Sequence, residues 1–132
     1  YGELYDKLFS PEQGSALVEA DYPDTREVVE LIHSAGGVAV LAHPFTYDSA
    51  DLMEELAESG LDGVEVWHPS HTESQTAQLL AYTRQHGLLA TGGSDFHGMY
   101  TRSPRPLGSV PVADDCVQQL LAYKDKRKRR NA

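Results

Sequence analysis

The segment VAVLAHP, at residues 38–44, decides how the chain is expected to fold, because five consecutive apolar residues end directly in a histidine and a proline. A short run that is apolar throughout is typical of a strand in a parallel sheet, where both faces are covered. Two further candidate strands follow, at residues 62–67, where Asp62 and Glu65 interrupt the apolar residues, and at residues 88–91. The sequence therefore predicts three buried strands, with an additional short strand at residues 108–110.

Helical segments alternate with these strands. The first is expected to begin at Asp24 or Thr25, either of which can cap a helix, and to stop before Gly36. The other predicted helices run from Ser49 through Glu58, from Thr72 or Ser74 to about His86, and from Val112 to Lys124, with a short leading helix around Leu4, Tyr5, Leu8 and Phe9. The residues expected to face inward are Val28, Val29, Leu31 and Ile32 in the first of these and Val117, Leu120 and Leu121 in the last. Helices that alternate with short apolar strands imply parallel βα units with right-handed crossovers, so the predicted fold class is α/β.

The composition is typical of one compact globular domain, with 132 residues of which 40% are hydrophobic and 23% charged. No apolar run reaches about 18 residues, so no membrane span is predicted. The first four residues do not have the charge and hydrophobicity of a signal peptide. The single cysteine, Cys116, cannot form an internal disulfide and is expected to be a packing residue. These features together favour a cytoplasmic location.

The net charge of −9 argues against broad electrostatic binding to nucleic acid. The basic residues that could do so gather at the end of the chain, as Lys124, Lys126, Arg127, Lys128, Arg129 and Arg130. Such a run is usually a solvated tail, and a nucleic-acid contact is the alternative. If the acidic remainder of the chain handles phosphate esters, bound cations must supply the positive charge.

Each of the three predicted strands ends in side chains that can bind a metal ion. These residues are His43 after the first strand, Glu65, His68 and His71 on or after the second, and Asp95 and His97 after the third. Parallel sheets gather their sites at the carboxyl ends of their strands, so these side chains should converge in one cleft. Imidazole and carboxylate together suit Zn, Mn or Fe.

Some of these residues also have plainer interpretations. A single histidine is more often a surface or packing residue than a ligand, and His33 and His86 are expected to be structural because each lies in the last turn of a helix. His68 fits a metal ligand, a residue that supports a ligand, or a loop residue equally well. Glu65 is either paired or metal-bound inside the sheet, or it faces outward from an edge strand. Coincidence is nevertheless a poor explanation for all three strand ends.

Three motifs resemble the later motifs of the phosphoesterases of the PHP (polymerase and histidinol phosphatase) family. They are residues 40–44, residues 63–66 followed by His71, and the Gly-Ser-Asp-Phe-His-Gly run at 93–98, which is fairly specific. The resemblance covers roughly residues 24–112. It is nearest to the bacterial branch that includes 3′,5′-nucleoside-bisphosphate phosphatases and 5′–3′ exoribonucleases.

The resemblance implies the C-terminal part of a distorted (β/α)7-type barrel that holds up to three divalent metal ions, Mn, Fe or Zn. The residues at metal-ligand positions of that pattern are His43, His71, Asp95 and His97. The roles of Glu65 and His68 stay open. On this interpretation the chain divides into a leading segment at 1–23, the PHP part at 24–123 and the basic tail at 124–132.

The implied activity is hydrolysis of phosphate esters, of nucleotides or short oligonucleotides, by a metal-activated hydroxide. Arg102 and Arg105 follow the Asp-x-His loop and could clamp a substrate phosphate, with solvated loop arginines as the alternative. The expected partner is therefore a phosphate-ester small molecule or a short nucleic acid. The sequence indicates neither the oligomeric state nor the identity of the substrate.

One departure from the family is large. The family places a His-x-His pair and further ligands in its N-terminal half, whereas the first histidine of this chain is His33. We therefore expect the isolated chain to hold metal weakly and to turn over little or no substrate. A non-catalytic PHP accessory module of a nucleic-acid enzyme is the alternative function.

Overall fold

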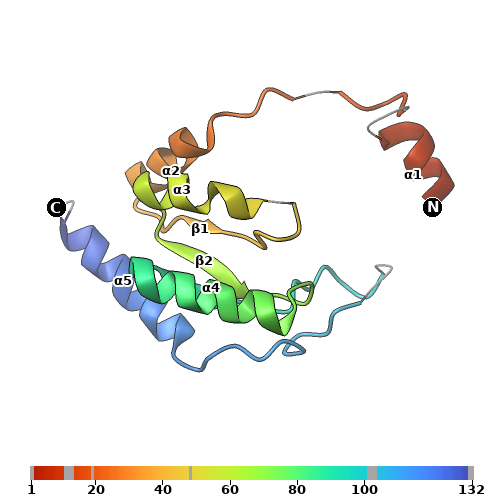
Figure 1. The fold of residues 1–132 in the computed structure, drawn as a ribbon. Coiled ribbons are helices and arrows are strands. Elements are labelled where there is room, and N and C mark those ends of the chain that lie inside the picture. The colour runs from red at the N-terminus through yellow and green to blue at the C-terminus, as the bar shows by residue number, and fades with distance from the viewer. Residues whose placement is uncertain (1, 11–13, 19, 48, 101–103, 131–132) are drawn as a thin grey trace.

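The computed structural model describes residues 2–10, 14–18, 20–47, 49–100 and 104–130 (Figure 1). Within these residues, three parallel strands form one sheet in the order β1-β2-β3. The strands are β1 (Val40–Leu41), β2 (Gly63–Trp67) and β3 (Leu89–Gly92). A helix lies between each strand and the next along the chain, so the prediction of parallel βα units in an α/β fold is confirmed.

The helices begin and end where the local sequence supplies caps. Their bounds are α1 (Gly2–Phe9), α2 (Thr25–Ser34), the 3-10 helix η1 (Ser49–Leu52), α3 (Met53–Glu58), α4 (Glu73–His86) and α5 (Cys116–Arg130). Asp24 caps α2 by accepting a hydrogen bond from the Arg26 N–H. Thr72 and Gln75 form a reciprocal capping box at α4, which ends at the left-handed Gly87. The predicted starts of α2 and α4 are therefore confirmed.

Several predicted bounds are wrong. The first strand has two residues rather than five, because only Val40 and Leu41 pair with β2. Ser49 begins a 3-10 turn, and the α-helix that follows has no side-chain cap. Residues 108–110 form no strand. Helix α5 begins at Cys116, after a turn closed by the Cys116 N–H on the Ala113 carbonyl oxygen. It continues to Arg130, into the segment expected to form a tail, because lysine and arginine favour helix and no glycine or proline interrupts them.

The hydrophobic core lies between the sheet and helices α2, α3 and α4. Its buried members are Val29, Ala39, Met53, Leu56, Leu61, Val64, Val66 and Leu79. Three residues expected to face inward are instead exposed, namely Leu31, Val117 and Leu121. Cys116 is buried as predicted, and burial raises the pKa of its thiol.

Asp62 anchors the end of the sheet opposite the predicted site. Its side chain is 1% exposed and lies just before β2. Oδ2 accepts hydrogen bonds from the Ala39 N–H at 2.7 Å and from His33 Nε2 at 2.9 Å, while Oδ1 accepts from the Tyr123 hydroxyl at 2.9 Å. One carboxylate therefore ties α2, the start of β1 and α5 together. The structural role predicted for His33 is consistent with this contact.

Figure 1 shows how the helices surround the sheet. Helix α4 packs against β2 and β3, and α5 packs against β3. The leading helix α1 forms as expected, lies away from the sheet and has no buried residue. None of the helices described combines the length and the apolar character that crossing a lipid bilayer requires.

Candidate metal and phosphate site

The side chains at the carboxyl ends of the three strands do converge. The imidazole rings of His43 and His68 lie with their centroids 5.3 Å apart, and those of His68 and His71 are also 5.3 Å apart. From the third strand end, Asp95 places Oδ2 at 3.4 Å from His68 Nε2. We call these four residues the His–Asp cluster. Three segments that are distant in sequence thus meet at one edge of the sheet, which the parallel topology predicted.

Two members of the cluster have a strained backbone. His43 has φ of 29° and Asp95 has φ of 52°, and they are the only non-glycine residues with positive φ among those that the structure describes. Such conformations are uncommon for residues with a Cβ atom and concentrate at functional sites. The surrounding contacts hold them in place. The His43 N–H, for example, donates to Glu65 Oε2 at 2.8 Å.

That contact defines the position of Glu65. Glu65 lies on β2, which is the central strand of the three, so the alternative of an outward-facing residue on an edge strand is wrong. Its side chain is half-buried and fixes the backbone that presents His43. Glu65 thus supports the cluster from within the sheet.

The tautomer of His71 follows from its surroundings. His71 Nδ1 lies 2.9 Å from the Val66 carbonyl oxygen, which can only accept a hydrogen bond, so Nδ1 carries the proton. In the neutral form of the ring, Nε2 is then the nitrogen without a proton. That atom is buried and has no hydrogen-bond partner in the described structure. A backbone carbonyl that fixes the tautomer in this way is typical of a metal-binding histidine.

His68 lies at the centre of the cluster, and the sequence left its role open. The side chain is 5% exposed, and its Nδ1 contacts the Ser70 hydroxyl at 2.6 Å. Burial lowers the pKa of His68, and the nearby carboxylates of Asp95 and Glu65 offset this only in part. In the sequence, the only indication that His68 belongs to the site is its position three residues before His71, directly after a predicted strand.

Asp95 is held by groups on both sides. Its Oδ2 accepts a hydrogen bond from Arg105 Nη1 at 2.7 Å, and its Oδ1 lies 3.5 Å from His97 Nδ1. Partial burial by itself would raise the pKa of Asp95. The contact with His68 and the positive charges of His97 and Arg105 outweigh that effect, so the pKa is lowered.

The remaining predicted site residues lie at the rim or beyond it. The side chain of His97 is 69% exposed, and its Nδ1 lies 2.7 Å from the Asp95 carbonyl oxygen, so it joins the cluster only through Asp95. Arg105 contacts Asp95 in the structure rather than open solvent alone. Arg102 falls outside the described residues.

The donor atoms of the cluster fit a divalent cation in their chemistry. Among the described residues, four buried ring nitrogens have no hydrogen-bond partner. Three of them belong to the cluster, namely His43 Nδ1, His68 Nε2 and His71 Nε2, and the fourth, His86 Nε2, lies on α4 at 3.6 Å from Glu54. Buried nitrogens without partners are costly unless something binds them. The described part of the chain nevertheless contains no group of three or more histidine, cysteine or acidic side chains arranged closely enough to hold a metal ion. The donors are thus of the right kind, but they do not form a complete site.

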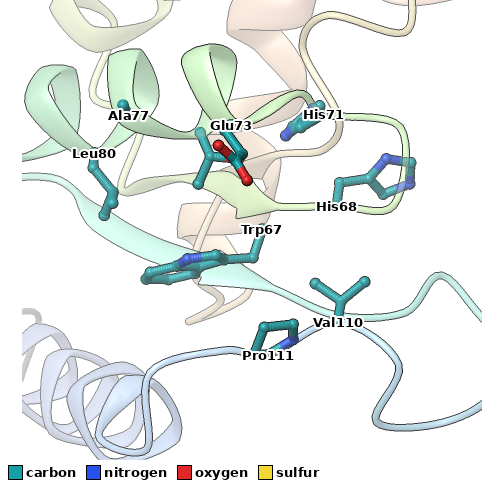
Figure 2. Close-up of a pocket in the computed structure, with 9 residues that line it drawn as sticks. Trp67, His68, His71, Glu73, Ala77, Leu80, Val110 and Pro111 are labelled. Atoms are coloured by element: carbon teal, nitrogen blue, oxygen red, sulfur yellow. The ribbon is translucent and has the colours of Figure 1, made fainter.

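A pocket of about 410 Å³ adjoins the cluster (Figure 2). His68 and His71 form one wall, α4 forms a second wall through residues such as Glu73 and Leu80, and Val110 and Pro111 close the lower side. The indole of Trp67 lies across the pocket from the α4 side chains. Most of this lining is apolar, so the pocket suits the apolar part of a ligand whose charged group lies at the histidines.

Comparisons with known proteins are consistent with this geometry. Over 112 residues, the chain is 41% identical to a phosphoribosyl 1,2-cyclic phosphate 1,2-diphosphodiesterase of Eggerthella lenta, covering 85% of the chain and 42% of that enzyme. It is 36% identical over 99 residues to a 3′,5′-nucleoside bisphosphate phosphatase of Chromobacterium violaceum, covering 71% of the chain and 34% of the phosphatase. No family model matches the sequence.

A solved structure extends the likeness to the fold. A Bifidobacterium adolescentis protein assigned as a metal-dependent phosphoesterase superposes with a TM-score of 0.73 at 33% identity, covering 92% of this chain and 43% of that protein. The chain is a relative of the PHP-family phosphoesterases. It spans less than half the length of these PHP relatives, which fits the expected C-terminal part, and its parallel sheet with flanking helices fits part of a PHP barrel.

Proposed function

We propose that this chain forms the C-terminal part of a metal-dependent phosphoesterase and that the His–Asp cluster supplies part of its metal site. The observation that carries the proposal is the set of buried, unpartnered ring nitrogens beside Asp95 at the carboxyl end of the sheet. The assignment of His43, His71, Asp95 and His97 as ligands is part of the proposal. We add His68, because its buried Nε2 lies 3.4 Å from Asp95 Oδ2.

The chain's own residues have distinct tasks in such an enzyme. His71 presents Nε2 because its Nδ1–H is committed to the Val66 carbonyl oxygen. Glu65 holds the backbone of His43 through the amide hydrogen bond. Asp95 contributes negative charge that attracts a cation to the neutral imidazoles. A bound divalent ion supplies Lewis acidity and lowers the pKa of a water molecule, which is the chemistry that phosphate-ester hydrolysis requires.

The proposed substrate is a phosphate ester of a nucleotide-like molecule. Two relatives carry names that describe action on phosphoribosyl cyclic phosphate and on nucleoside bisphosphate. The apolar pocket beside His68 and His71 offers space for the part of such a molecule that is not phosphate. Arg105, one contact away from the cluster through Asp95, is placed to meet the phosphate group. We also propose that the bound metal ion is Mn, Fe or Zn.

The test is Asp95→Ala, made both in this chain and in the longest protein that contains it. Asp51→Ala serves as the matched control, because Asp51 is an exposed aspartate on η1. We expect Asp95→Ala to reduce bound metal in both settings and to abolish hydrolysis of phosphate esters in the longer protein. Unchanged metal content and unchanged rate would refute the proposal. Metal binding that depends on Asp95, without hydrolysis of any ester, would favour the accessory-module alternative.

A second pair of variants tests the histidines separately. His71→Ala removes a buried Nε2 of the cluster. His86→Ala removes a histidine whose Nε2 is likewise buried without a hydrogen-bond partner but lies outside the cluster, on α4, where the ring stacks on Tyr82 with centroids 4.2 Å apart. We expect the first change to weaken metal binding by about tenfold or more and the second to leave it unchanged. Equal effects of the two changes would count against the cluster.

A further inference from the structure

Arg105 and His68 both contact the same oxygen atom of Asp95. Asp95 Oδ2 accepts the hydrogen bond from Arg105 Nη1 at 2.7 Å and also lies 3.4 Å from His68 Nε2. The oxygen that faces the buried imidazole is therefore the oxygen that the guanidinium holds. The Asp95 and Arg105 side chains are 29% and 33% exposed, so the contact is partly shielded from solvent.

We infer that Arg105 is a stand-in cation for the metal site, which holds Asp95 Oδ2 when no metal is bound and must leave it when a metal binds. The inference rests on the proposed function, because it takes Asp95 to be a metal ligand. Arg105 is then a positioning residue that acts through Asp95. This role comes before any contact that Arg105 makes with a substrate phosphate.

Electrostatics supports an exchange rather than simultaneous binding. A guanidinium and a divalent cation on the same carboxylate oxygen lie within a few ångströms of each other and repel, and partial burial strengthens the repulsion. Without either cation, the Asp95 carboxylate would keep only the histidine contacts, with His68 Nε2 at 3.4 Å and the exposed His97 Nδ1 at 3.5 Å. The backbone of Asp95 is already strained, with φ of 52°, so a partner that fixes the side chain also keeps the loop in its binding conformation.

The exchange has a consequence for the order of events. While Arg105 is bound to Asp95, its guanidinium is committed to a carboxylate. When a metal takes Oδ2, the guanidinium is released next to the site where a phosphate would bind. Metal binding and the availability of this phosphate-binding group are thereby coupled through one atom.

The experiment measures the zinc affinity of the 132-residue chain by competition with a chromogenic chelator. Arg105→Ala removes the competing cation, and Arg105→Lys keeps a positive charge at the position. Arg26→Ala is the matched control, because Arg26 also pairs with an aspartate, at 3.0 Å from Asp24, but on the exposed start of α2. We expect Arg105→Ala to bind zinc about three- to tenfold more tightly than wild type, since loss of a partly exposed ion pair changes affinity by an amount of this order. Arg105→Lys should stay within about twofold of wild type, and Arg26→Ala should not differ from it.

Thermal unfolding gives a second measurement that a purely structural role of Arg105 would not reproduce. In the presence of a chelator, Arg105→Ala should have a lower melting temperature than wild type, because Asp95 has lost its contact with Arg105. Saturating zinc should then raise the melting temperature of Arg105→Ala by more than it raises that of wild type, because a ligand that binds more tightly stabilises the folded state more. A smaller rise for Arg105→Ala than for wild type would overturn the inference.

The possible failures are distinguishable. Zinc binding that Asp95→Ala abolishes but Arg105→Ala weakens or leaves unchanged overturns the stand-in role and keeps the proposed function. If no variant shows zinc binding that depends on Asp95, both the stand-in role and the proposed function are overturned.

Discussion

The carboxylate of Asp62 should be one of the largest single contributors to the stability of this fold. It is 1% exposed and, from the residues that the structure describes, accepts three hydrogen bonds, from the Ala39 amide, from His33 and from the Tyr123 hydroxyl. Asp62→Ala removes the acceptor and leaves all three donors facing an apolar methyl group. Ala39 is itself 2% exposed, so its amide cannot turn to solvent instead.

The expected loss follows from these contacts. A hydrogen bond to a charged group contributes roughly 1.5–3 kcal/mol, and a buried donor left without a partner costs about 1–3 kcal/mol. Three such bonds are not additive, so we expect Asp62→Ala to lower the free energy of unfolding by about 4 kcal/mol. Asp62→Asn keeps an oxygen for Ala39 and His33 and should lose about half as much. Tyr123→Phe removes one donor and should cost about 1 kcal/mol.

Urea unfolding is the direct assay, because the chain has a single tryptophan, Trp67, whose fluorescence reports on the sheet. The exposed Asp21 provides the control, since Asp21→Ala should change the free energy of unfolding by no more than about 0.5 kcal/mol. If Asp62→Ala leaves too little folded protein to titrate, Asp62→Asn and Tyr123→Phe still yield values. A loss below about 1 kcal/mol for Asp62→Ala would refute the view that this carboxylate holds the elements together.

Three further predictions follow from local contacts. Thr72→Ala removes the capping box of α4 and should cost about 1 kcal/mol in the free energy of unfolding by urea titration, whereas Thr72→Ser should cost little. Gly92→Ala places a Cβ atom within about 3 Å of the Trp67 backbone, so it should destabilise by about 2 kcal/mol and shift the tryptophan emission. The hydrogen bond from Arg26 lowers the pKa of Asp24 to about 2. Because the pKa is lower in the folded state, the contribution of the Asp24–Arg26 contact to stability is complete above the unfolded pKa near 4 and is lost as the pH falls toward 2. An NMR titration in which Asp24 shows a pKa of 4 would contradict this prediction.

The elements with complete local signals were predictable from the sequence. Helix α4 has a capping residue at Thr72 and a left-handed Gly87 at its end, and both signals are visible without a structure. The convergence of the strand ends was also predictable, because it depends only on parallel topology. The length of β1 was not, since an apolar run becomes a strand only where a neighbour pairs with it, and β2 pairs with just two of its residues.

Helix faces failed for a related reason. Leu31 and Val117 are apolar and stand at helical spacing, yet they are 63% and 66% exposed. The pattern of a single helix shows which residues could be buried, but the surface that covers them comes from other parts of the molecule. Asp62 is a polar residue whose burial the sequence did not predict, because its hydrogen-bond partners lie 23, 29 and 61 residues away along the chain.

His43 and Asp95 were predicted as site residues, but their backbone conformation was not. Both residues were candidates by side-chain chemistry and position after a strand, and the family resemblance placed them at metal-ligand positions, in both cases without reference to backbone angles. The structure then places both residues, and no other non-glycine residue that it describes, at positive φ. Aspartate and histidine adopt positive φ more often than most residues with a Cβ atom, but the sequence does not indicate which of them will do so. Strain of this kind persists only where surrounding contacts enforce it. Positive φ thus occurs at two of the candidate ligands that the sequence had already marked by side-chain chemistry and position.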